Sequence, residues 1–72
     1  MRTEDLSRMA NQIAAFFAAY PEAEGVAGVE EHLLKFWDPL MRRELLAAPA
    51  SQRATLHPLV LKVLERLARA GT

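Results

Sequence analysis

The stretch FWDPLM, residues 36–41, decides the fold class, because one helix ends inside it and another begins at once. Asp38 is of a residue type favoured as an N-cap, and Pro39 suits the first helical position, where a backbone N–H has no partner to lose. The pair predicts a helix from Pro39 to about Ala48. Pro49 ends that helix, since the residue before a proline disfavours helical backbone angles.

The same cap-and-proline arrangement returns at His57-Pro58, with histidine a poorer cap than aspartate. Apolar residues at helical spacing follow it, namely Leu59, Val60, Val63, Leu64 and Leu67. They predict a last helix that frays at Gly71. Residues 49–56 are expected to form a connector with room for one helical turn.

An apolar stripe also precedes the deciding stretch, and its members are Leu6, Met9, Ile13, Phe17 and Tyr20. Their three- and four-residue spacing predicts a helix over about residues 4–19. Thr3 is the predicted N-cap, because its hydroxyl can accept a hydrogen bond from a first-turn amide. Pro21 marks the end of this helix.

A second stripe, made of Val26, Val29, Leu33, Phe36 and Trp37, predicts a helix from Val29 to Trp37. Gly25 and Gly28 leave residues 22–28 undecided, because glycine lowers helix propensity. With no strand pattern in the sequence, the expected fold is all-α, a compact bundle of three to four short helices in one domain spanning residues 1–72.

The composition argues against a catalytic protein. Cysteine is absent, which rules out disulfides and thiolate metal sites, and His32 and His57 form no ligand pattern. Ser7 lies far in sequence from either histidine. We therefore expect no catalytic, cofactor-binding or metal-binding residue, and no bound cofactor.

No signal peptide and no apolar run long enough to cross a bilayer is visible, so a soluble, cytoplasmic protein without a membrane partner is expected. The net charge is zero, which predicts no general attraction to nucleic acid. Residues 1–31 are acidic and residues 32–72 basic. This asymmetry either orients a partner or draws the two halves together within the fold.

Some polar and aromatic residues are poorly explained by a core that one chain forms alone. They are the candidate partner-binding residues, Asn11, Gln12, Phe16, His32, Lys35 and Arg42. Phe16 and Phe17 point in well-separated directions, so Phe16 is either an exposed anchor or part of a broad buried face. Asn11 lies nearly opposite the first stripe and is either a partner contact or a neutral surface residue.

His32 and Lys35 flank the second stripe, with Gly28 one turn earlier. The small residue either admits the backbone of a partner or belongs to a solvated flank. Trp37 is expected to pack at the corner between two helices. Lys35, Arg42 and Arg43 form a local basic cluster, which either binds an acidic surface or a phosphate or is simply solvated.

Three blocks of sequence resemble the delta subunit of NAD-dependent formate dehydrogenase. The first is MANQIA at 9–14, FF at 16–17 and YP at 20–21; the second is AGV at 27–29, His32, KFW at 35–37 and Pro39 with Met41-Arg42; the third is PLV at 58–60. The similarity covers roughly residues 6–67. At the last helix an acidic cap is expected before Pro58, where this chain has His57.

The resemblance implies a small, non-catalytic accessory subunit of a soluble, cytoplasmic molybdenum- or tungsten-dependent enzyme that passes electrons from formate to NAD. It implies docking onto the large molybdenum-cofactor-containing subunit, in support of assembly or stability, with the redox cofactors held by the other subunits. Two alternatives stay open. One is a maturation chaperone that binds the molybdenum cofactor through the basic cluster, and the other is a homo-oligomeric helical module.

The short chain yields a first prediction. Domains below about 70–80 residues rarely gain more than about 3–5 kcal/mol from their own core, and this one has no disulfide to add. The isolated protein should be helical but only modestly stable, or self-associating. Circular dichroism melting with sedimentation tests this, and a monomer that melts above about 90 °C would contradict it.

Overall fold

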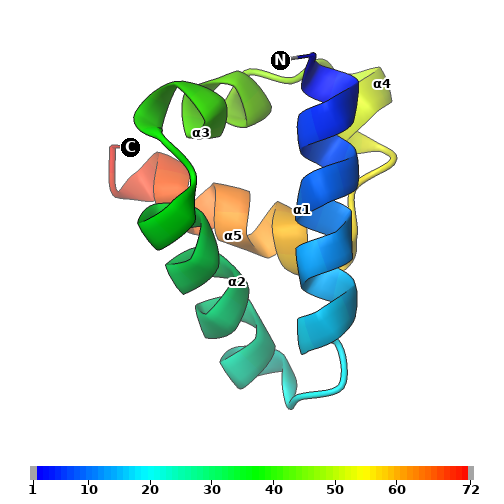
Figure 1. Ribbon diagram of the computed structural model, residues 1–72, viewed down its shortest axis with the longest axis vertical. Coiled ribbons are helices and arrows are strands. Elements are labelled where there is room, and N and C mark those ends of the chain that lie inside the picture. The colour runs from blue at the N-terminus through cyan, green and yellow to red at the C-terminus, as the bar shows by residue number, and fades with distance from the viewer. Residues whose placement is uncertain (1, 72) are drawn as a thin grey trace.

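The structure, a computed structural model, describes residues 2–71, and within that range the chain is helical with no strand. The helices are α1 (Thr3–Phe17), α2 (Glu22–Phe36), α3 (Pro39–Leu46), α4 (Ala50–Arg53) and α5 (Pro58–Arg69). Figure 1 shows α1 and α2 joined at one end and diverging toward α3, while α5 crosses behind them. The predicted all-α bundle is confirmed, and α4 is the single turn in the connector.

The caps at two helix starts are confirmed. The backbone N–H of Met41 donates to the Asp38 carboxylate at 2.9 Å, and that of Leu59 donates to His57 Nδ1 at 3.0 Å. Pro39 and Pro58 stand at the first helical positions. These two corners are therefore determined by residues next to each other in the sequence.

Other boundaries differ from those predicted. α1 begins at Thr3 itself, so the prediction of Thr3 as N-cap is wrong, and Arg2 occupies that position. α1 ends at Phe17, and the N–H of Tyr20 bonds the Phe17 carbonyl in the turn that follows. α2 already begins at Glu22 and includes both glycines, because tertiary packing there outweighs their low helix propensity.

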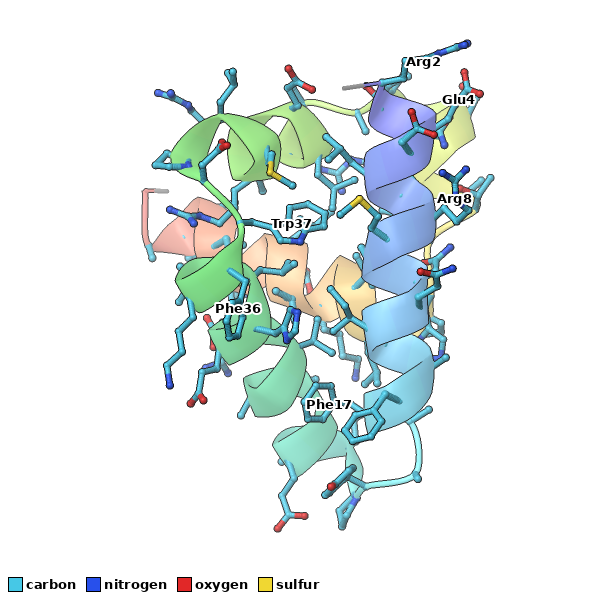
Figure 2. The ribbon with its side chains drawn as sticks, viewed as in Figure 1. Arg2, Glu4, Arg8, Phe17, Phe36 and Trp37 are labelled. Atoms are coloured by element: carbon cyan, nitrogen blue, oxygen red, sulfur yellow. The ribbon has the colours of Figure 1, made fainter. Side chains whose placement is uncertain are left out.

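The core lies where α1, α2 and α5 meet. Its fully buried large side chains are Leu6, Leu33, Leu45, Leu64, Leu67, Val29, Val60 and Val63. Trp37 is buried as well, at the corner between α2 and α3 as predicted, and Figure 2 shows it in the wide part of the space between α1 and α2.

The narrow end of that space depends on two glycines. A Cβ atom at Gly28 would overlap the Phe17 ring, and one at Gly25 would lie 3.0 Å from the Phe17 carbonyl oxygen. The glycines thus let the end of α1 pack directly on α2. The small residue at 28 makes room for Phe17 of the same chain.

This contact generates a second prediction. Gly28→Ala should lower stability by roughly 1 kcal/mol, because about 1–3 kcal/mol of overpacking outweighs about 1 kcal/mol of gained helix propensity. Urea titration measures the loss. In a Phe17→Leu background the same substitution should be neutral or stabilising, since the ring that it overlaps is gone. Ala27→Gly on the exposed side of α2 is a control for propensity alone. Equal effects of Gly28→Ala in the two backgrounds would contradict the explanation.

Candidate functional site

One side of the molecule carries two exposed phenylalanines beside partly buried apolar side chains at the edge of the core. We call it the α1–α2 face, and it consists of Met9, Gln12, Ile13 and Phe16 from α1, His32 and Phe36 from α2, and Trp37 and Met41 beyond it. Phe16 is 65% exposed and Phe36 72%. In Figure 2 this side faces the viewer, with α5 behind it. Exposed aromatic side chains gathered on one face are typical of protein interfaces.

Two depressions lie in series on this face. The larger, of about 420 Å³, is lined by Met9, Gln12, Ile13, His32, Phe36, Trp37 and Met41. The smaller, of about 230 Å³, is lined by Phe17, Ala27, Gly28, Glu31, His32, Lys35 and Phe36. His32 and Phe36 belong to both linings, and their ring centroids are 4.8 Å apart. This stacked pair, one helical turn apart on α2, forms the ridge between the two depressions.

Aromatic rings extend the face to the end of α1. Phe16 meets Phe17 edge-on, with centroids 5.0 Å apart and planes at 90°, and Tyr20 lies within 6.2 Å of both rings. Phe17 is held against α2, so it fixes the exposed Phe16 ring beside it. Of the two alternatives for Phe16, the structure shows the exposed one.

The face carries little charge. The larger depression is lined by neutral side chains together with His32. At the smaller one, Lys35 Nζ lies 3.2 Å from Glu31 Oε1, and both side chains are about two-thirds exposed. Such exposed pairs add little stability, but they neutralise each other locally. The chemistry of the face is therefore apolar contact with a few polar groups.

The candidate residues fall into two groups. Gln12, Phe16, His32 and Lys35 lie on or beside the face, and Gln12 and His32 line the same depression from opposite helices. Phe36, assigned to the buried stripe from its spacing, is instead exposed because α1 has diverged from α2 at that level. The sequence contained a signal for this exposure. Phe36 and Trp37 are neighbours, and because neighbouring helix positions point about 100° apart, only one of the two side chains can face the core.

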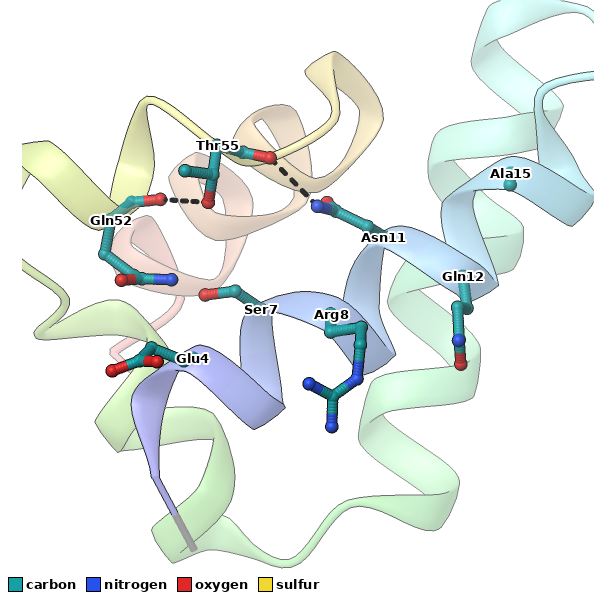
Figure 3. Close-up of a pocket in the computed structure, with 8 residues that line it drawn as sticks. All are labelled: Glu4, Ser7, Arg8, Asn11, Gln12, Ala15, Gln52 and Thr55. Atoms are coloured by element: carbon teal, nitrogen blue, oxygen red, sulfur yellow. Dashed lines mark hydrogen bonds between the residues drawn. The ribbon is translucent and has the colours of Figure 1, made fainter.

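Asn11 does not line either depression of the α1–α2 face, and it lies instead beside Thr55. Its amide nitrogen donates to the Thr55 carbonyl at 2.9 Å, as Figure 3 shows, and its amide oxygen accepts from the His57 N–H at 2.8 Å. The side chain thus ties α1 to the segment that leads into α5. The expectation that a partner supplies the hydrogen bonds of Asn11 is wrong, because the fold supplies them.

Arg42 is also used inside the fold. Its guanidinium donates to the Leu33 carbonyl at 3.2 Å and to the Trp37 carbonyl at 2.6 Å, which satisfies acceptors at the end of α2. Lys35 pairs with Glu31 at one hollow, while Arg42 and Arg43 line another with Pro39 and Gly71, so the expected basic cluster is divided between two places.

Ion pairs between α2 and α5 account for part of the charge asymmetry. Glu22 pairs with Lys62 at 2.8 Å, and Glu30 pairs with Arg66 at 3.0 Å. At these positions the acidic first half and the basic second half attract each other within the fold.

A family model matches most of the chain. The model describes the delta subunit of NADH-dependent formate dehydrogenase, FdsD, and it matches residues 5–64. The chain belongs to this family. The resemblance found in the sequence is therefore confirmed, and the family name implies association with the formate dehydrogenase complex. No curated protein and no solved structure matched the chain.

The FdsD match spans every residue of the α1–α2 face. Within residues 2–71 there is no group of three or more histidine or acidic side chains placed to hold a metal ion, and no helix long and apolar enough to cross a membrane. The α1–α2 face is an exposed apolar feature that the core of this chain leaves unexplained.

The internal role of Asn11 generates a third prediction. Asn11→Ala should cost about 1–3 kcal/mol, because it leaves the His57 N–H and the Thr55 carbonyl without their partner. Asn11→Asp should also be destabilising, because it keeps the acceptor for His57 but sets a carboxylate oxygen against the Thr55 carbonyl oxygen in place of a donor. Thermal melts of the free chain measure both. Gln12→Ala, at an exposed neighbouring position, is the control and should change stability by no more than about 0.5 kcal/mol. A loss for Asn11→Ala as small as the control would contradict the assignment.

Proposed function

We propose that this chain is a non-catalytic accessory subunit, which docks through the α1–α2 face onto the large molybdenum-cofactor-containing subunit of formate dehydrogenase. Docking supports assembly or stability of the complex. The observation that carries the proposal is the exposure of Phe16 and Phe36 on one face of a chain that belongs to the delta-subunit family. Burying apolar surface contributes about 25 cal/mol per Å², so two exposed phenylalanines are a substantial source of binding energy.

The polar groups on the face suit recognition. They are the Gln12 amide, the His32 imidazole and the Lys35–Glu31 pair. His32 stacks on Phe36 rather than activating a hydroxyl or thiol nucleophile, which is the arrangement that covalent catalysis needs. On this proposal the redox chemistry belongs to the other subunits, and the chain acts where they meet.

We favour docking over the maturation-chaperone alternative, which would use the basic cluster around Arg42, because the Arg42 guanidinium already bonds the end of α2. Self-association through the same apolar face stays open for the isolated chain and is separated from docking by the experiment below.

A fourth prediction tests the docking surface. Phe16→Ala or Phe36→Ala should weaken association with the large subunit by about 2 kcal/mol or more, as truncated interface anchors do. Lys35→Glu should weaken it as well, because it places two like charges at the edge of the face. Co-purification of the tagged chain with the large subunit from the native host measures association.

Circular dichroism of the free variants is the companion measurement, and helical content should stay nearly unchanged. Leu61→Ala is the matched control, since Leu61 is a partly exposed apolar residue on the outer side of α5. Unchanged association in all three face variants would show that the proposed surface is wrong. Unfolding of free Phe16→Ala would assign that ring to the core, and recovery of the chain with itself alone would favour the homo-oligomeric module.

A further inference from the structure

We infer that His57 makes the start of α5 sensitive to pH, because its imidazole caps this helix only while the ring is uncharged. The switch is local. Acidification through the range in which histidine titrates loosens the first turn of α5, while the cap of α3 stays in place. This property belongs to the chain itself, and it does not depend on which partner the chain docks onto.

The first turn of α5 has one backbone donor that relies on the imidazole. Pro58 has no N–H, and the N–H groups of Val60 and Leu61 both donate to the His57 carbonyl, at 2.9 Å and 3.1 Å. The Leu59 N–H donates instead to His57 Nδ1 at 3.0 Å. A ring nitrogen accepts a hydrogen bond only when it carries no proton. Protonation of His57 therefore leaves the Leu59 N–H facing a second donor.

A positive charge on the imidazole is unfavourable here for a second reason. The N-terminus of a helix carries partial positive charge, so a cation beside it is destabilising. No ion pair among the described residues includes His57, and Glu24 at the facing start of α2 is exposed. The other charged groups on the elements around His57 have partners of their own. They are Arg8 with Asp5, Arg53 with the Leu46 carbonyl, and Lys62 with Glu22.

The capped turn packs where α1 meets α2. Leu59 is buried, and a Cβ atom at Gly25 would lie 3.4 Å from its side chain and 3.0 Å from the Phe17 carbonyl oxygen. A backbone N–H left without a partner at such a place costs about as much as a lost hydrogen bond. The backbone N–H of His57 still donates to Asn11 when the ring is protonated. Acid therefore loosens the turn at this junction without releasing the segment from α1.

Asp38 provides a comparison within the same molecule. It caps α3 ahead of Pro39 as His57 caps α5 ahead of Pro58, and its carboxylate accepts from the Met41 N–H at 2.9 Å. Carboxylic acids ordinarily lose their proton near about pH 4, whereas histidine changes its charge between about pH 5 and 8. Between about pH 7.5 and 5.5, the α5 cap should open and the α3 cap should not.

An NMR titration of the native chain from about pH 7.5 to 5.5 is the first test. We expect the amide proton resonance of Leu59 to shift upfield as the His57 ring takes up its proton, because that amide loses its acceptor. The Met41 amide should keep its position, since its acceptor is the Asp38 carboxylate. A Leu59 amide that moves no further than the Met41 amide would overturn the inference.

Thermal melts at the same two pH values are the second test. His57→Asn and His57→Asp keep a favoured cap that does not titrate between them, and His32→Gln removes the other histidine as the matched control. On acidification, the melting temperatures of the native chain and of His32→Gln should fall by about 4 °C or more beyond the fall in the His57 variants. That is the shift expected when a domain of this size loses one cap. An equal fall in the native chain and His57→Asn would contradict the assignment, and so would a fall that disappears in His32→Gln.

Discussion

The packing of Phe17 on Gly28 is the contact on which the rest of the structure depends. It brings the end of α1 against the start of α2, where Gly25 also admits the Phe17 carbonyl. The two helices are held together at this end and diverge toward α3. Figure 1 shows the resulting V shape. The back of the V is filled by α5, and the wide end is filled by Trp37. The front stays open, and the two depressions lie there.

A chain this small, without a disulfide, holds its elements together with polar side chains that bond distant backbone groups. Asn11 joins α1 to the Thr55–His57 segment, Arg42 joins α3 to the end of α2, and Arg53 donates to the Leu46 carbonyl at 2.9 Å. Hydrogen bonds from charged groups to backbone acceptors are among the stronger ones. Because these side chains are used inside, the surface left for a partner is mainly apolar.

The sequence was sufficient at the two corners where a cap stands beside a proline, but not at Thr3, where the same local reasoning placed the helix start one residue too late. The Asp38 and His57 caps, the adjoining prolines and the divergence of Phe16 from Phe17 depend on neighbouring residues, and each was predicted. The role of Asn11 depends on a segment more than 40 positions away. The local pattern therefore showed only that a polar residue stands inside a helix, not what it bonds. The exposure of Phe36 likewise depends on how far α1 has diverged at that level. Helical spacing identifies a stripe, but tertiary packing decides where the buried part of the stripe ends.

Trp37 links the core to the docking face. It is 5% exposed and packs with the core, yet it also lines the larger depression beside Met9 and Met41. A partner that fills this depression therefore packs against a core residue, and it adds contacts at the corner between α2 and α3. Any partner that binds only the folded chain stabilises it by mass action. The open V leaves aromatic rings exposed in the free chain. On the proposed function, the partner buries these rings and so extends the core of the subunit. Docking and the stability of this subunit are then one coupled equilibrium.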